Sequence, residues 1–173
     1  MDPVRIAAIS EVHSPRQSGG LVWLALSGLV IVFDAWTKAL ALEHLQLHQP
    51  LPVFDGLLNW TLVYNPGAAF SFLSDASGWQ RWFFSLLAVG ISTLLAVWLH
   101  RTPRRDWRQA VPYALVIGGA LGNLIDRLVH GHVIDFIDLY LGNHHWPAFN
   151  IADSAVVVGA IGIALVGLLI KPR

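Results

Sequence analysis

Residues 21–42 read LVWLALSGLVIVFDAWTKALAL, an apolar run in which Asp34 and Lys38 are the charged residues. A helix needs about 20 residues to cross the hydrocarbon core of a bilayer. Lipid offers the backbone no hydrogen-bond partner, so a segment of this composition forms a helix there. The run therefore predicts a membrane span. Asp34 and Lys38 lie four residues apart, which places them on one helical face as an ion pair that positions the helix.

A secretory signal peptide is the alternative interpretation of this run, because Ala39 to Ala41 resembles a cleavage site after an apolar core. Asp34 and Lys38 stand between that core and the supposed site, which argues against removal. We expect a retained helix preceded by a loosely ordered tail of residues 1–20.

Three further apolar stretches predict helices at about 82–99, 111–129 and 151–170. The 173 residues are 55% hydrophobic and 13% charged, far more apolar than a typical soluble domain. We expect an all-α membrane protein, one integral membrane domain over 1–173 with four transmembrane helices. The formal net charge of +0 gives no reason to expect a nucleic-acid partner. The absence of cysteine excludes a thiol nucleophile and a disulfide.

Most basic residues in the loops and chain ends fall on one side of these four spans, and Arg81 is the only one at the border of the other side. Cytoplasmic loops hold Lys and Arg in excess. The basic residues on the first side are Arg5, Arg16, Arg101, Arg104, Arg105, Arg108, Lys171 and Arg173. Both termini are therefore predicted to be cytoplasmic, with segments of about 43–80 and 130–150 facing outward. In the first outward segment, LPVF at 51–54 and LNWTLVY at 58–64 flank Asp55-Gly56 and predict a small hairpin.

Ionisable residues at membrane depth are costly, which makes them candidates for function. The candidates are Asp34, Lys38, Asp126, Arg127, Asp135 and Asp153, all in the outward half of this topology. Ions and protons also move along such residues, so a transporter or proton relay is one alternative, and a scaffold without catalysis is another. The relay is disfavoured because these residues do not continue through the cytoplasmic halves of the spans.

Neither Asp135 nor Asp153 has an adjacent basic residue in sequence, so the two could form an acid/base pair if the fold brings them together. Two carboxyl groups brought together without a metal can share one proton and activate a water. Asn150 can cap the last helix, whose N-terminus favours a carboxylate at Asp153, while apolar neighbours raise the pKa of Asp135. In the alternative interpretation, Asp153 is only a helix cap and Asp138 is a solvated loop acid.

The remaining polar candidates allow both structural and functional interpretations. Asp126 and Arg127 are expected to form an interfacial pair that closes helix 111–129, while Arg127 and Asn123 share a face suited to orienting a substrate or a carboxylate. Gly118, Gly119 and Gly122 allow close helix approach. Asn65 and Gly67 belong to a turn, and Asn65 is also suited to bind substrate.

Two other kinds of site are disfavoured. A dyad of Lys38 with Ser71 or Ser154 needs a neutral lysine, and Asp34 would hold Lys38 protonated. His130, His132, His144 and His145 have spacings that are weak signals for a metal site, so no metal is predicted.

Five motifs in order resemble the lipoprotein signal peptidase family, also called signal peptidase II. They are DAWTK at 34–38, NPGAAFSF at 65–72, GGALGNLIDR at 118–127, HVIDFID at 132–138 and PAFNIADS at 147–154. The first departs from the family pattern, which usually has Gln where this chain has Ala35.

The resemblance implies four transmembrane helices with a small periplasmic β-cradle and a short amphipathic surface helix. It implies an aspartic endopeptidase of the bacterial inner membrane that cleaves diacylglyceryl-modified prolipoproteins just before the lipidated Cys. The catalytic pair falls on Asp135 and Asp153, supported by Asn65, Asn123, Arg127 and Asn150. Globomycin is the inhibitor expected in the pocket. No cofactor is expected, and a monomer is predicted.

Overall fold

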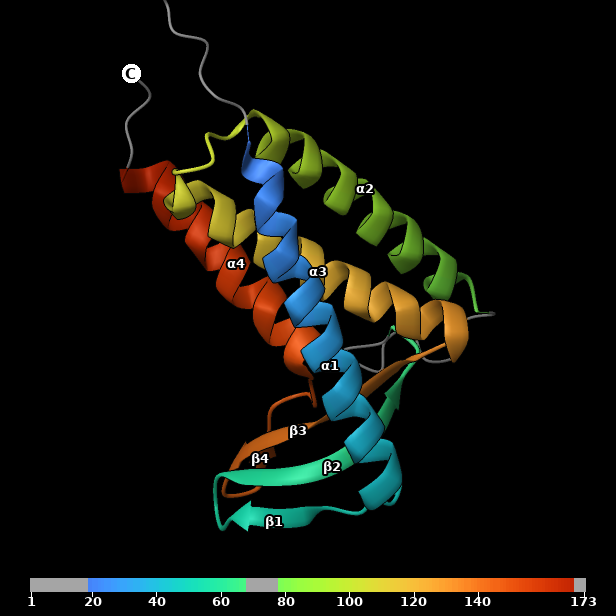
Figure 1. Cartoon of the computed structure of the whole chain (residues 1–173). Coiled ribbons are helices and arrows are strands. Elements are labelled where there is room, and N and C mark those ends of the chain that lie inside the picture. The colour runs from blue at the N-terminus through green and yellow to red at the C-terminus, as the bar shows by residue number, and fades with distance from the viewer. Residues whose placement is uncertain (1–18, 68–77, 170–173) are drawn as a thin grey trace, which may run out of the picture.

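The computed structural model describes residues 19–67 and 78–169, in which four helices form a bundle with a small sheet at one end (Figure 1). The helices are α1 Leu24–His44, α2 Trp79–Arg101, α3 Trp107–Val129 and α4 Ile151–Leu169, with a 3₁₀ turn at Gly20–Trp23 before α1. They overlap the four segments predicted from apolar composition. The short amphipathic surface helix that the resemblance implies is not seen in 19–67 or 78–169.

Within residues 19–67 and 78–169, three helical segments are long and apolar enough to cross a membrane, namely Gly20–His44, Trp79–Arg101 and Ile151–Leu169. The fourth, α3, has a more polar sequence and packs against α1, α2 and α4. Its side chains Asn123 and Asp126 are buried in protein. A central position thus lets α3 carry polar groups that a lipid-facing helix would expose at high cost.

Glycines on α3 allow the close helix approach that the sequence predicts. A Cβ atom on Gly118 would lie 2.8 Å from the Cβ atom of Val30 in α1. A Cβ atom on Gly119 would collide with the backbone oxygen of Ala152 in α4. Because α1 and α4 both press against this stretch, polar side chains from three helices meet near the sheet end of the bundle.

The sheet is antiparallel with strand order β1-β2-β3-β4. Its strands are β1 Leu51–Phe54, β2 Leu58–Asn65, β3 Val133–Leu141 and β4 His144–His145. The predicted hairpin is present, because β1 pairs with β2 across a turn in which Gly56 has a φ of 82°. Figure 1 shows this sheet beside the ends of α1 and α3 and the start of α4.

The strand β3 was not predicted, and it occupies much of the segment between α3 and α4. It pairs along β2, with Val63 opposite Asp135 and Asn59 opposite Asp138. Most of its first half is buried, including Val133, Ile134 and Phe136. A strand covered on both faces lacks the polar and apolar alternation that marks a half-exposed strand, so its acids interrupt an apolar run instead.

Candidate active site

Asp153 lies in the first turn of α4, where Asn150 caps the helix as predicted. The backbone N–H of Asp153 donates to Oδ1 of Asn150 at 2.8 Å, and the backbone N–H of Asn150 donates to Oδ2 of Asp153 at 3.2 Å. This reciprocal arrangement is a capping box. It fixes the start of α4 and the direction of the Asp153 carboxyl group together.

Asp135 comes from β3 and meets the same asparagine. Nδ2 of Asn150 donates to Oδ1 of Asp135 at 2.7 Å, and the Asn150 side chain is completely buried. Asn150 therefore contacts both carboxyl groups, one through its side chain and the other through its backbone. The structure thus brings together Asp135 from β3 and Asp153 from α4.

Asn65, at the end of β2, holds the other oxygen of Asp135. Its Nδ2 donates to Oδ2 of Asp135 at 3.0 Å, while its Oδ1 accepts the backbone N–H of Gly67 at 2.9 Å. Gly67 has a φ of 108°, and a Cβ atom there would lie 2.8 Å from the Phe84 ring. Both the conformation and the space require glycine, so the turn that anchors Asn65 depends on this residue. Ser71, in the same motif, lies outside the described residues.

Asn123, on α3, serves Asp153 in the same way. Its Nδ2 donates to Oδ1 of Asp153 at 2.7 Å. Its Oδ1 accepts Nδ2 of Asn150 at 3.2 Å, which joins the two amides. Three asparagines from β2, α3 and the α4 cap therefore direct side-chain N–H groups at the two acids.

The surroundings of Asp135 favour the protonated acid. The residue is only 1% exposed. Burial, together with the negative charge of Asp153, raises the pKa of Asp135 to about 7, although the hydrogen bonds from Asn65 and Asn150 act in the opposite direction. This agrees with the raised pKa expected from its apolar neighbours.

The Asp34–Lys38 ion pair is present and includes a third member. The ammonium of Lys38 lies 2.6 Å from Oδ2 of Asp34 and 2.8 Å from Oδ2 of Asp126. The expectation that Asp126 pairs with Arg127 at the membrane surface is wrong. Asp126 instead turns into the bundle, where Lys38 and the backbone N–H of Ile134 at 3.1 Å satisfy it.

Arg127 is bound by its own helix and by an aromatic ring of α2. Its Nη1 donates to the backbone oxygen of Asn123 at 3.1 Å, and its guanidinium lies 5.3 Å from the centre of the Phe84 ring. In the parts of the chain that are described, Arg127 forms no ion pair within 4.0 Å. Its charge is available near the pair without neutralising either acid directly.

Asp138 is not the solvated loop acid of the alternative interpretation. It is buried on β3 and accepts Nδ2 of Asn59 at 3.1 Å, the hydroxyl of Thr61 at 3.2 Å and Nδ1 of His145 at 2.8 Å. Burial alone would raise the pKa of Asp138, but these hydrogen bonds hold it below its usual range. No local pattern indicates this cluster, because its members are up to 86 residues apart.

The Ser/Lys alternative is not formed by the serine that is described. The Ser154 hydroxyl donates to the backbone oxygen of Asn150 at 2.9 Å, whereas Lys38 is bound to two acids and an amide. Across 19–67 and 78–169, no three His, Asp or Glu side chains are grouped so that they could hold a metal ion.

Comparisons with known proteins agree with one another. The family model described as signal peptidase (SPase) II matches residues 26–169. A lipoprotein signal peptidase from Xanthomonas campestris pv. campestris (strain 8004) is 68% identical over 148 residues, which cover 86% of this chain and 89% of that protein. A lipoprotein signal peptidase from Xylella fastidiosa (strain 9a5c) is 59% identical over 154 residues, which cover 89% and 92%.

The chain belongs to the signal peptidase II family. A solved structure described as a bacterial membrane enzyme has a TM-score of 0.74 and 29% identity, and the match covers 88% of this chain and 94% of that one. The resemblance carried by the five motifs is therefore confirmed. Membership places the chain among membrane peptidases that process lipoproteins, and not among the transporters or scaffolds considered from sequence.

A cavity of about 570 Å³ opens beside Asp153 in this signal peptidase II chain. Most of its lining is apolar and comes from the loop before α4 and the first turns of that helix. The lining residues are Asn65, Leu139, Trp146, Pro147, Ala148, Phe149, Asp153, Ser154, Val157 and Val158. A cavity of this kind suits a ligand with apolar groups and one reacting bond near the acid.

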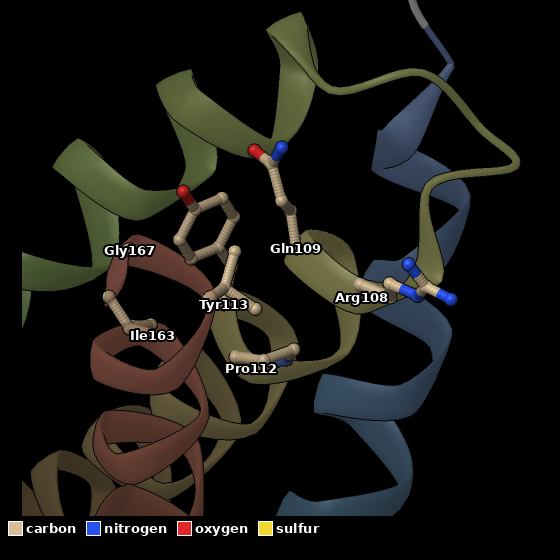
Figure 2. A pocket seen from close by; sticks show the side chains of 7 residues that line it. Arg108, Gln109, Pro112, Tyr113, Ile163 and Gly167 are labelled. Atoms are coloured by element: carbon tan, nitrogen blue, oxygen red, sulfur yellow. The ribbon is translucent and has the colours of Figure 1, made fainter. Parts of the chain in front are cut away.

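A second cavity, of about 300 Å³, lies between α3 and α4 at the opposite end of the bundle. Figure 2 shows Gln109, Pro112 and Tyr113 of α3 facing Ile163 and Gly167 of α4 there. This cavity contains no carboxylate and none of the predicted site residues. The acids, the asparagines and the larger cavity therefore lie together at the sheet end.

Proposed function

We propose that this chain is an aspartic endopeptidase that cuts the signal peptide from diacylglyceryl-modified prolipoproteins just before the lipidated Cys. The observation that supports the proposal most strongly is the shared contact of Asp135 and Asp153 with Asn150. Neither acid has a Lys or Arg within ion-pair distance among the described residues. Close carboxyl groups without a neutralising cation share a proton, which is the condition for acid and base catalysis by such a pair.

The proposed resting state carries one proton, mainly on Asp135, whose pKa of about 7 supports this assignment. Ionised Asp153 removes a proton from a water molecule as the water oxygen attacks the scissile carbonyl carbon. The proton of Asp135 passes to the carbonyl oxygen. When the intermediate collapses, the C–N bond breaks and Asp153 gives its proton to the leaving nitrogen. One hydroxyl of the intermediate returns its proton to Asp135 as the C=O bond re-forms, which restores the resting state.

The cavity beside Asp153 supports a substrate that enters from the lipid. Val157 and Val158 of α4, which are exposed on the helix surface, form part of its lining. Two acyl chains would hold the substrate in the outer leaflet, with its scissile bond at the depth of the start of α4. This would raise the local concentration of the scissile bond at Asp135 and Asp153. Globomycin is proposed to occupy the same cavity.

The proposed topology has four spans in a bacterial inner membrane, with α3 as the third in chain order. α2 leads away from the sheet end and α3 returns to it (Figure 1). The arginines between them, Arg101, Arg104, Arg105 and Arg108, would then lie in the cytoplasm with both chain ends. The sheet and both catalytic acids would lie at the periplasmic face. The working unit is proposed to be a monomer without cofactor.

The test is incubation of the purified protein with a diacylglyceryl-modified prolipoprotein and with the same protein lacking the lipid. The expected result is a gel shift of the lipidated protein alone, because two acyl chains supply most of the membrane partitioning. Mass spectrometry should place the new N-terminus at the lipidated Cys. Equal cleavage of the unlipidated protein, or cleavage at another bond, would contradict the proposed substrate.

A further inference from the structure

The ammonium of Lys38 has three acceptors, and the third is an amide. Besides Asp34 and Asp126, it donates to Oδ1 of Asn123 at 3.1 Å. An ammonium group has three N–H donors, so each acceptor takes one. Two acids already exceed the charge of one lysine, so neutralising Lys38 does not require the contact with Asn123. That contact connects the ion cluster to Asp153, which Asn123 binds through its Nδ2.

The orientation of the Asn123 amide follows from its neighbours. Its oxygen faces the ammonium of Lys38 and Nδ2 of Asn150, which are both donors. In the flipped orientation, an NH₂ group would face those donors and a carbonyl oxygen would face the Asp153 carboxylate. Since Lys38 has donors and no acceptor, it cannot adapt to the flipped amide.

The other two asparagines of the site have backbone anchors. Oδ1 of Asn65 accepts the N–H of Gly67, and Oδ1 of Asn150 accepts the N–H of Asp153. A backbone N–H cannot change from donor to acceptor, so each anchor fixes which end of the amide faces an acid. The donors to Oδ1 of Asn123 are instead two side chains, Lys38 and Asn150.

We propose that Lys38 is a positioning residue, whose ammonium orients the Asn123 amide so that its N–H group is donated to Asp153. The inference rests on the proposed function and extends it to a residue on α1 that touches neither acid of the pair. Asp34 and Asp126 fix the ammonium in place. Oδ1 of Asp34 also accepts the N–H of Ala152 at 2.8 Å, so Lys38 is held relative to the start of α4.

A double-mutant cycle on Lys38→Met and Asn123→Leu separates this role from a purely structural one. The measurement is kcat and KM for cleavage of a synthetic diacylglyceryl-modified peptide, per folded molecule in detergent. Each single variant should lower kcat by about 10-fold to 100-fold, the worth of one hydrogen bond to a charged group. The double variant should be no slower than the slower single variant, because both changes remove the same N–H donation.

Multiplied losses in the double variant would overturn the proposal, since Lys38 would then act independently of Asn123. If Lys38→Met does not fold, the cycle is run with Asp34→Asn/Lys38→Met/Asp126→Asn in its place. That variant leaves no uncompensated charge in the cluster and keeps acceptors for the N–H groups of Ala152 and Ile134. For this triple variant we expect the same loss of kcat as for Lys38→Met. Adding Asn123→Leu to it should cause no further loss.

Ser27→Ala is the matched control. The buried Ser27 hydroxyl also links α1 to α3, through the backbone oxygen of Ala114 at 2.8 Å. This variant should unfold at a lower temperature with unchanged kcat, and an equal loss of kcat would mean that any loosened α1–α3 contact slows the enzyme. Asp135→Asn and Asp153→Asn are assayed beside it. Active forms of these two would contradict the proposed function itself, whereas inactive forms with multiplied losses in the cycle would contradict the role of Lys38 alone.

Discussion

Asp135 and Asp138 lie three residues apart on β3 and are both buried, but their pKa values shift in opposite directions. Asp138 accepts hydrogen bonds from Asn59, Thr61 and His145, which hold its pKa below the usual range against the effect of burial. Burial and the charge of Asp153 raise the pKa of Asp135 to about 7, even though two asparagines donate to it.

The difference shows that burial alone does not distinguish a structural acid from a chemical one. Hydrogen-bond donors favour the charged form of both residues, but only Asp135 faces a second carboxylate. A like charge nearby makes ionisation costly and leaves a proton available near neutral pH. On this basis β3 carries one acid suited to proton transfer and one that holds the sheet together.

The largest expected effect is on turnover. Asp135→Asn and Asp153→Asn should each lower cleavage of the lipidated substrate by about 10²-fold to 10⁴-fold or more, the contribution of a positioned acid or base. Asp138→Asn should leave turnover per folded molecule unchanged. The amount of folded protein is checked by size-exclusion chromatography, so that loss of fold is not counted as loss of chemistry. A slow Asp138→Asn enzyme beside a normal Asp135→Asn enzyme would reverse the comparison.

The next effect is on the pH dependence of cleavage. If protonated Asp135 is the acid, kcat/KM should fall by about tenfold per pH unit above pH about 7, as that proton is lost. Asp138→Asn should keep the same upper limb, because Asp138 is ionised throughout this range. Activity that stays constant to pH about 9 would mean that Asp135 does not supply the proton.

The smallest effect is on the pH dependence of folding stability. Asp135 should make the protein less stable as the pH rises, and Asp138 should make it less stable as the pH falls. The raised pKa of Asp135 gives stability that is fully present below its ordinary value of 3.8 and is lost as the pH rises to about 7. The lowered pKa of Asp138 gives stability that is present above 3.8 and is lost as the pH falls below it.

Unfolding temperatures in detergent across pH about 2 to about 8 test these signs. Relative to wild type, Asp135→Asn should gain stability as the pH rises from about 4 to about 7. Asp138→Asn should be less stable at neutral pH by about 1 to 3 kcal/mol, the worth of hydrogen bonds to a charged group. If the unfolding temperatures of the two variants changed with pH in the same way, the two acids would not differ in their pKa shifts.

The sequence predicted what depends on local pattern. Apolar length indicated the four helices, Asp55-Gly56 indicated the hairpin, and the spacing of Asn150 and Asp153 indicated the cap. The partners of Asp126 and Asp138 could not be predicted in this way. Lys38 lies 88 residues before Asp126, and Asn59 lies 79 residues before Asp138, so tertiary packing alone brings them together.

The central claim is that the pair of Asp135 and Asp153 holds one proton, which is lost with a midpoint near pH 7. Infrared difference spectroscopy of the purified protein, titrated across pH about 5 to about 9, observes this proton directly as the C=O stretch of a protonated carboxyl group. The account predicts one such band, with a midpoint near 7, that is lost in Asp135→Asn and retained in Asp138→Asn. A spectrum without a protonated carboxyl group at neutral pH, or a band that persists in Asp135→Asn, would contradict it.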